Sequence, residues 1–122
     1  NFAHTFGHAL ESVSDYAAPH GSAVAIGMMI ANEISVQRGF LSKEYANRIK
    51  NVCNKILKNI SIESQWGDID NFIKAIRKDK KQINESIRAV LLQDGSYLSV
   101  YDDVSAIEIQ HAVESILGKD FE

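Results

Sequence analysis

Residues 22–31 read SAVAIGMMIA and carry no charged side chain. A helix that is apolar nearly all round is buried on every side, so this segment is predicted to form the central helix of the domain. It is expected to end near Arg38-Gly39, where glycine can adopt the left-handed cap. Gly27 lies inside it and costs roughly 1 kcal/mol relative to alanine, which a close approach of another helix would explain. The other elements are expected to pack around this run.

The spacing of apolar residues predicts further helices on both sides of the central one. We expect them at residues 3–17, 43–58, 69–78 and 105–117. Ser42 and Asp68 are the expected N-caps of the second and third of these, and Ser105 opens a capping box for the last. The helix over 43–58 is expected to turn one apolar face inward, made of Tyr45, Ile49, Val52, Ile56 and Leu57.

A small β-hairpin is predicted between the last two helices. Ile87 to Leu92 is a short β-leaning run, Asp94-Gly95 is a turn signal, and Tyr97 to Tyr101 alternates. The predicted fold class is therefore mainly α, α+β at most, with residues 1–122 forming a single domain.

Composition narrows the classes of function. The chain has 122 residues, 24% of them charged, and a net charge of −3 with acidic and basic residues interleaved. No basic stripe suited to nucleic acid is present, and no apolar run is long enough to span a membrane. The single cysteine, Cys53, cannot form an internal disulfide, which favours a reducing compartment and hence the cytoplasm.

Three of the four histidines lie near the start of the chain. His4 and His8 are four residues apart and so share one helix face, whereas His20 follows Pro19, which breaks any helix. A chain reversal there could bring His20 toward the other two, and such imidazole clusters are typical of transition-metal sites. Glu11 extends the same stripe. It could be a third ligand, a partner of a ligand or a solvated residue, and the last two readings are favoured.

Asp79-Lys80-Lys81 ends the helix predicted over 69–78. Lysines at a helix C-terminus complement the helix dipole, so a solvated terminus is one interpretation. Paired lysines also hold anions, so a phosphate or carboxylate ligand is the other.

Two motifs resemble one enzyme family. NFAHTFGHA at residues 1–9 and HGSAVAIGM at residues 20–28 are similar to the N-F-G-H-T-x-G-H-A and H-G-E-A-V-A-x-G-M patterns of the 3-dehydroquinate synthase C-terminal domain. Asp79-Lys80-Lys81 resembles that family's later D-K-K segment, so the similarity spans roughly residues 1–95. Ala3 and Ser22 depart from the patterns, as does the lack of a glycine soon after D-K-K. These departures leave room for a sister cyclase, such as a 2-deoxy-scyllo-inosose or epi-valiolone synthase.

The resemblance implies the helical C-terminal domain of an NAD-dependent and Zn²⁺- or Co²⁺-dependent lyase of the shikimate pathway. Such an enzyme converts a seven-carbon keto-acid phosphate to 3-dehydroquinate with loss of phosphate. NAD would be bound mainly by an N-terminal domain outside this sequence, and the full-length protein would be a homodimer. That N-terminal domain would also supply the third metal ligand, a glutamate, so Glu11 would not be that ligand.

Carried over by position, the resemblance assigns roles to four named residues and to one of two lysines. His4 and His20 match the metal ligands, His8 matches a catalytic histidine near the substrate phosphate, and Asn1 and one of Lys80 or Lys81 match substrate-binding residues. The 122 residues alone are expected to bind zinc weakly and to be inactive.

Two alternatives remain. One is a metal-dependent polyol or alcohol dehydrogenase domain, which the lysine pair disfavours because a simple polyol carries no phosphate. The other is a non-enzymatic helical interaction domain.

Overall fold

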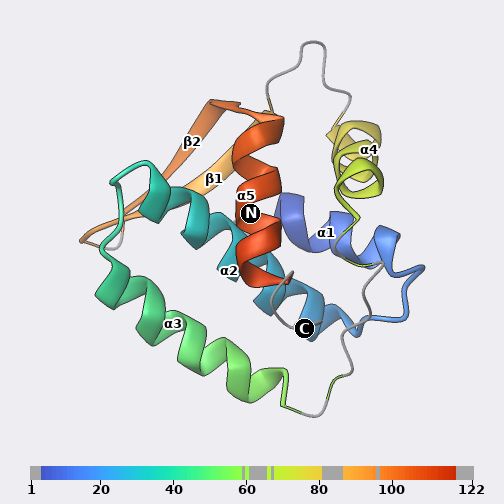
Figure 1. The fold of residues 1–122 in the computed structure, drawn as a ribbon, viewed down its shortest axis with the longest axis horizontal. Coiled ribbons are helices and arrows are strands. Elements are labelled where there is room, and N and C mark those ends of the chain that lie inside the picture. Colours follow the sequence, from blue (N-terminus) through green and yellow to red (C-terminus); the bar gives the residue numbers. More distant parts are fainter. Residues whose placement is uncertain are drawn as a thin grey trace.

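The structure is a computed structural model that describes residues 4–58, 60, 66, 68–80, 87–95 and 97–117. Figure 1 shows helices gathered around one helix, with a two-stranded hairpin at one side. In chain order the elements are α1 (His4–Val13), α2 (His20–Gln37), α3 (Lys43–Ile56), α4 (Ile69–Lys80), β1 (Ile87–Gln93), β2 (Tyr97–Val104) and α5 (Ala106–Ile116). The mainly α class with one hairpin is thereby confirmed.

The apolar run predicted to be central forms α2, which contacts α1, α3, α5 and β1. Ala23, Ile26, Ile30 and Ile34 are fully buried along it, since neighbours cover the helix on several sides. Its C-terminal glycine cap is also confirmed, because Gly39 has a φ of +78°.

The first helix is shorter than the predicted range of residues 3–17, because α1 ends at Val13. The amide of Tyr16 donates to the carbonyl of Glu11 at 2.7 Å, and that of Asp15 donates to Ser12 at 3.0 Å. This pair of bonds is a Schellman motif, with Asp15 at the left-handed position that glycine usually occupies (φ 55°). The chain therefore turns back four residues earlier than the apolar spacing suggests.

The second helix begins earlier than expected. Pro19 is the N-cap of α2 and His20 is its first residue, whereas the apolar run that predicted this helix begins at Ser22. Proline suits a helix start because its fixed φ is compatible with the helix and the amide hydrogen it lacks is not needed there. His20 is thus placed on a helix terminus with a defined backbone direction.

The inward face of α3 was predicted wrongly in part. Val52 and Ile56 are more than half exposed, while Cys53 and Leu57 are buried. Cys53 and Leu57 are one turn apart and point toward α2, which packs against α3. Ile49 lies on the same stripe and packs against the core as expected.

The remaining elements agree with the sequence prediction. Phe72 and Ile76 of α4 are buried, and Ser105 and Glu108 form the capping box of α5. The strands pair antiparallel, with a register shift between Ile87 and Ala89, and the turn glycine Gly95 has a φ of +86°. Among the helices described, none is long and apolar enough to cross a membrane.

Candidate metal and substrate site

The site begins where α1 crosses α2. A Cβ atom placed on Gly7 would lie 3.4 Å from the carbonyl oxygen of Ala23 and 3.5 Å from Cα of Val24. Only a residue with little or no side chain lets the two backbones approach this closely. The structure therefore shows close packing of two helices at Gly7. The close approach expected at Gly27 stays a prediction.

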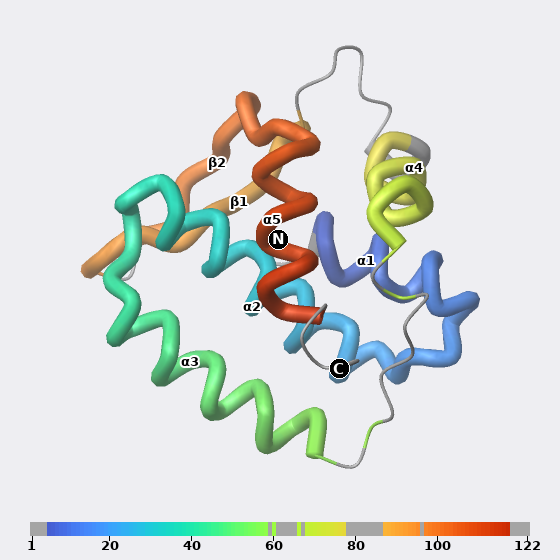
Figure 2. The backbone as a smooth tube through the Cα atoms, in the orientation of Figure 1, coloured from blue at the N-terminus to red at the C-terminus, as the bar shows by residue number. Residues whose placement is uncertain are grey.

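One polar stripe on α1 faces away from the buried Phe6 and Leu10. Positions 4, 8 and 11 share a helix face, with His8 half-buried and Glu11 following it toward the helix end. Figure 2 traces the chain as it reverses after α1 and enters α2. The reversal brings the first residue of α2 back to the end of this stripe.

His20 and Glu11 meet at that point. Nδ1 of His20 lies 3.1 Å from Oε2 of Glu11, a hydrogen bond between the first residue of α2 and the last full turn of α1. The Glu11 side chain is 16% exposed and that of His20 is 66% exposed. The chain reversal thus brings His20 to the end of the α1 stripe, where its partner is Glu11, while its return to His4 and His8 stays a prediction.

Other predicted site residues fall partly outside the described part of the chain. Asn1 and Lys81 lie outside it. His4 is the first residue of α1 and Lys80 the last residue of α4, and for both only the place on the helix is described. The structure brings α1 and α4 into contact, so the helix that ends at Lys80 packs on the histidine helix.

The donor set at the α1–α2 junction fits a metal ion in part. A carboxylate only accepts hydrogen bonds, so a neutral His20 carries its proton on Nδ1 and keeps the Nε2 lone pair free. Neutral imidazole with one free nitrogen is the usual histidine ligand of Zn²⁺ and Co²⁺. Within the described residues, no three His, Cys, Asp or Glu side chains converge on one point.

A hollow of about 490 Å³ lies between α1 and α4. Ser12 and Val13 line it from α1, and Asn71, Lys74 and Ala75 line it from α4. Ser12 lies four residues after His8 and so continues the row of positions 4 and 8, whereas Val13 is turned away from that row. The hollow therefore adjoins the histidine face of α1 at Ser12.

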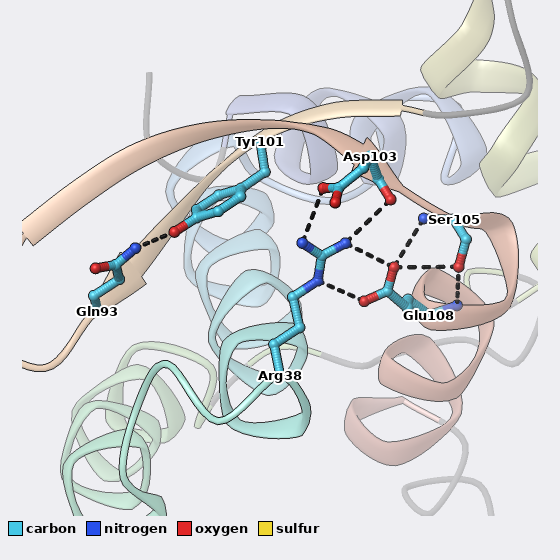
Figure 3. A network of polar contacts seen from close by, with 6 residues as sticks. All are labelled: Arg38, Gln93, Tyr101, Asp103, Ser105 and Glu108. Atoms are coloured by element: carbon cyan, nitrogen blue, oxygen red, sulfur yellow. Dashed lines mark hydrogen bonds and ion pairs between the residues drawn. The ribbon is translucent and has the colours of Figure 1, made fainter.

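A second polar cluster lies at the other end of α2, and no local sequence signal points to it. Arg38 donates from Nε to Glu108 at 2.6 Å and from Nη1 to Asp103 at 2.9 Å, as Figure 3 shows. Its guanidinium also lies 5.6 Å from the centre of the Tyr101 ring. The cluster joins the end of α2 to β2 and α5, and its charges are paired with one another, so we assign it a structural role.

The pKa values of this cluster reflect the pairing. The hydrogen bond from Arg38 is the main cause that lowers the pKa of Glu108 to about 2, and a hydrogen bond from the Ser105 amide adds to it against the opposing effect of burial. The same pair raises the pKa of Arg38. Both groups stay charged at neutral pH.

The fold itself is shared with solved structures of 2-deoxy-scyllo-inosose synthase. One structure of 2-deoxy-scyllo-inosose synthase, complexed with carbaglucose-6-phosphate, NAD⁺ and Co²⁺, matches with a TM-score of 0.78 and 24% identity, covering 95% of this chain and 34% of that one. Another structure of 2-deoxy-scyllo-inosose synthase matches with a TM-score of 0.69 and 21% identity, covering 95% of this chain and 31% of that one. The chain thus shares its fold with about a third of each of these structures.

Sequence similarity identifies the family. The family described as 3-dehydroquinate synthase C-terminal matches residues 1–82. The 3-dehydroquinate synthase of a Nitratiruptor species is 36% identical over 110 residues, which are 89% of this chain and 31% of the relative. The enzyme of the same name from Dehalococcoides mccartyi is 34% identical over 118 residues, 95% of this chain and 32% of the relative.

A third relative, the 3-dehydroquinate synthase of Campylobacter jejuni serotype O:6, is 39% identical over 92 residues, 75% of this chain and 26% of the relative. The chain belongs to the 3-dehydroquinate synthase C-terminal family. It spans about a third of the length of the curated relatives it matches.

Proposed function

We propose that this chain is the metal- and substrate-binding domain of a 3-dehydroquinate synthase. The reaction would be the NAD- and metal-dependent cyclisation of a seven-carbon keto-acid phosphate to 3-dehydroquinate, with loss of phosphate. The observation that carries the proposal is the family match over residues 1–82, which contains the histidine stripe of α1 and the His20–Glu11 junction.

His4 and His20 are the proposed metal ligands of this chain. His20 is supported by its exposed imidazole, whose Nδ1 is engaged by Glu11 and whose Nε2 is left for a ligand bond. When bound, the metal supplies Lewis-acid polarisation of substrate oxygens, and NAD accepts and returns a hydride. Two histidines fill only part of a coordination sphere, so a third ligand, a glutamate, is proposed to come from the N-terminal domain.

The remaining roles concern the phosphate end of the substrate. His8 lies one turn along α1 from His4, so a substrate oriented by the metal would extend past His8. An imidazole there can hold the phosphate by a hydrogen bond and transfer a proton as a positioned acid or base. We propose that one of Lys80 or Lys81 supplies a positive charge to the same phosphate and that Asn1 donates hydrogen bonds to the substrate.

The rest of the protein is part of the proposal. An N-terminal NAD-binding domain would account for the part of the curated relatives that this chain does not cover, and we propose that the full-length protein is a homodimer. Cys53 is a buried free thiol, which suits the cytoplasm.

Metal content of the full-length protein tests the ligand assignment. We expect His4→Ala and His20→Ala each to abolish binding of Zn²⁺ or Co²⁺, measured by elemental analysis after dialysis against a chelator. We expect His8→Ala to retain the metal and to lower turnover by about 10²- to 10⁴-fold, the usual contribution of a positioned acid or base. Equal loss of metal in all three variants would contradict the assignment.

Substrate choice tests the reaction. Turnover is measured with the seven-carbon keto-acid phosphate, with a hexose phosphate, and with an unphosphorylated polyol, following phosphate release or NAD reduction. Release of phosphate from the first substrate alone supports the proposal. Activity on the hexose phosphate would identify a sister cyclase, and activity on the polyol alone would identify a dehydrogenase.

A further inference from the structure

The hydrogen bond between Glu11 and His20 has a role beyond joining two helices. We propose that Glu11 is a positioning residue that fixes the tautomer and the ring orientation of His20, so that Nε2 is presented for metal binding. This inference rests on the proposed function, because it assigns to Glu11 a role toward a metal ligand of that site. Glu11 itself is not proposed as a ligand.

The local backbone holds Glu11 in place. Its carbonyl oxygen accepts hydrogen bonds from the Ser14 hydroxyl at 3.0 Å and from the Tyr16 amide at 2.7 Å. The Ser14 hydroxyl in turn accepts from the Ala18 amide at 3.2 Å, which ties the reversal to the end of α1. A side chain that is only 16% exposed on such a backbone has few alternative positions.

His20 has no comparable restraint of its own. It is the first residue of α2, its side chain is 66% exposed, and Glu11 is the partner that the described residues give it. Without that partner the imidazole is free to rotate about its side-chain bonds and to carry its proton on either nitrogen. A proton on Nε2 blocks the nitrogen that Glu11 leaves free, and freezing a mobile ring costs entropy on metal binding.

A carboxylate on Nδ1 removes both difficulties. Because it accepts and cannot donate, it selects the Nδ1–H tautomer and holds the ring in one orientation. Metal-binding histidines usually have such a partner, and loss of the partner typically weakens metal affinity by about 10- to 100-fold.

A competing explanation is purely structural. Glu11 lies beside the N-terminus of α2, which has no acidic residue in its first turn and no side-chain cap. A negative charge there stabilises the helix dipole whether or not a metal binds. The test must therefore measure a property that helix stabilisation leaves unchanged, such as the tautomer of His20.

The experiment uses the full-length protein, stripped of metal, with Co²⁺ and Zn²⁺ affinities measured by competition with a chelator. We expect Glu11→Ala to weaken affinity by about 10- to 100-fold, and Glu11→Gln to weaken it less because its amide oxygen still accepts from Nδ1. The matched control is Glu33→Gln, which removes a carboxylate that is hydrogen-bonded to Gln37. It lies 13 residues farther along α2, roughly 20 Å from His20 by helix rise, and is expected to leave affinity unchanged.

A second measurement follows the tautomer directly. In the metal-free protein, ¹⁵N NMR of the imidazole is expected to show a single Nδ1–H form for His20, and a mixture of forms in Glu11→Ala. Helix stabilisation by Glu11 would change the melting temperature and leave the tautomer unaltered. Glu11→Gln keeps the size and polarity of the side chain, so it serves if Glu11→Ala fails to fold.

The outcomes separate this inference from the proposed function. If His20→Ala loses the metal while both Glu11 variants bind it within twofold of the wild type, the positioning role is overturned and the metal site stands. An unchanged tautomer in both Glu11 variants overturns the role equally. If the wild type binds no metal, the proposed function fails and the inference fails with it.

Discussion

Replacing Arg38 by methionine should destabilise the chain by about 2 kcal/mol at neutral pH. Arg38 holds three parts of the molecule together: the end of α2, the last residues of β2, and the capping box of α5 (Figure 3). Methionine keeps the aliphatic stem of the side chain but removes the guanidinium, and with it every hydrogen bond, the charge and the contact with the Tyr101 ring. The variant therefore isolates the polar contribution of the cluster.

The magnitude follows from the pKa of Glu108. Lowering that pKa from 4.5 to about 2 corresponds to roughly 3 kcal/mol of preference for the charged form in the folded state. The Glu108 side chain is 26% exposed, so solvent screens part of this, and the Ser105 hydrogen bonds persist in the variant. Asp103 is 74% exposed and contributes little. The remaining loss is about 2 kcal/mol, or a fall in melting temperature of about 8 °C for 122 residues.

The pH dependence gives an independent check. A carboxylate whose pKa is lower in the folded chain stabilises it fully above the unfolded pKa, and this stabilisation is lost as pH falls. The difference between wild type and Arg38→Met should therefore be constant above about pH 5 and shrink between 4.5 and about 2.

Urea unfolding of both chains, followed by circular dichroism at several pH values, measures this difference. The matched control is Arg88→Met, which breaks a 2.6 Å pair with Asp102 whose partners are 69% and 70% exposed, and it should leave the midpoint nearly unchanged. A loss in Arg38→Met no greater than in the control, or a difference that persists at pH 2, would refute the reasoning.

Three further predictions test the packing of the helices. Gly7→Ala should be tolerated, because the added Cβ would lie at ordinary contact distance from Ala23. Gly7→Val should lower the free energy of unfolding by about 1–3 kcal/mol, because its larger side chain forces α1 away from α2. Equal melting temperatures for the two variants would contradict this prediction. Cys53 is 3% exposed, and burial raises the pKa of its thiol. A disulfide reagent at pH 8 should therefore label Cys53 only after the protein unfolds. Rapid labelling of the folded protein would show that α3 separates from the core. Asn32 is 2% exposed, and its side-chain amide atoms have no hydrogen-bond partner among the described residues. Asn32→Leu should therefore raise the free energy of unfolding by about 1 kcal/mol. A clear loss of stability would show that the Asn32 amide is hydrogen-bonded in the folded protein.

Local signals in the sequence predicted the helix ends well where one side chain or one glycine sets them. Ser42 accepts from the Tyr45 amide at 3.2 Å, and Ser105 forms its capping box, because both interactions span only three residues. The end of α1 was predicted wrongly, because its Schellman motif places Asp15 in the left-handed conformation that a glycine would usually signal.

The inward face of α3 shows a second limit. Val52 and Cys53 are neighbours, and either could extend the stripe that begins at Ile49. Helix periodicity places the two side chains about 100° apart, and only the position of α2 decides which is buried. Cys53 is covered and Val52 is left in solvent.

The sequence by itself determined the central helix, the hairpin, and the histidines from which the site is built, because composition, periodicity and family motifs are written along the chain. The tertiary structure alone decided which side chains meet. Arg38 and Glu108 are 70 residues apart, and Glu11 and His20 are joined only because α1 ends early and the chain reverses. Such contacts depend on how helices approach one another in space, which no local spacing of residues specifies.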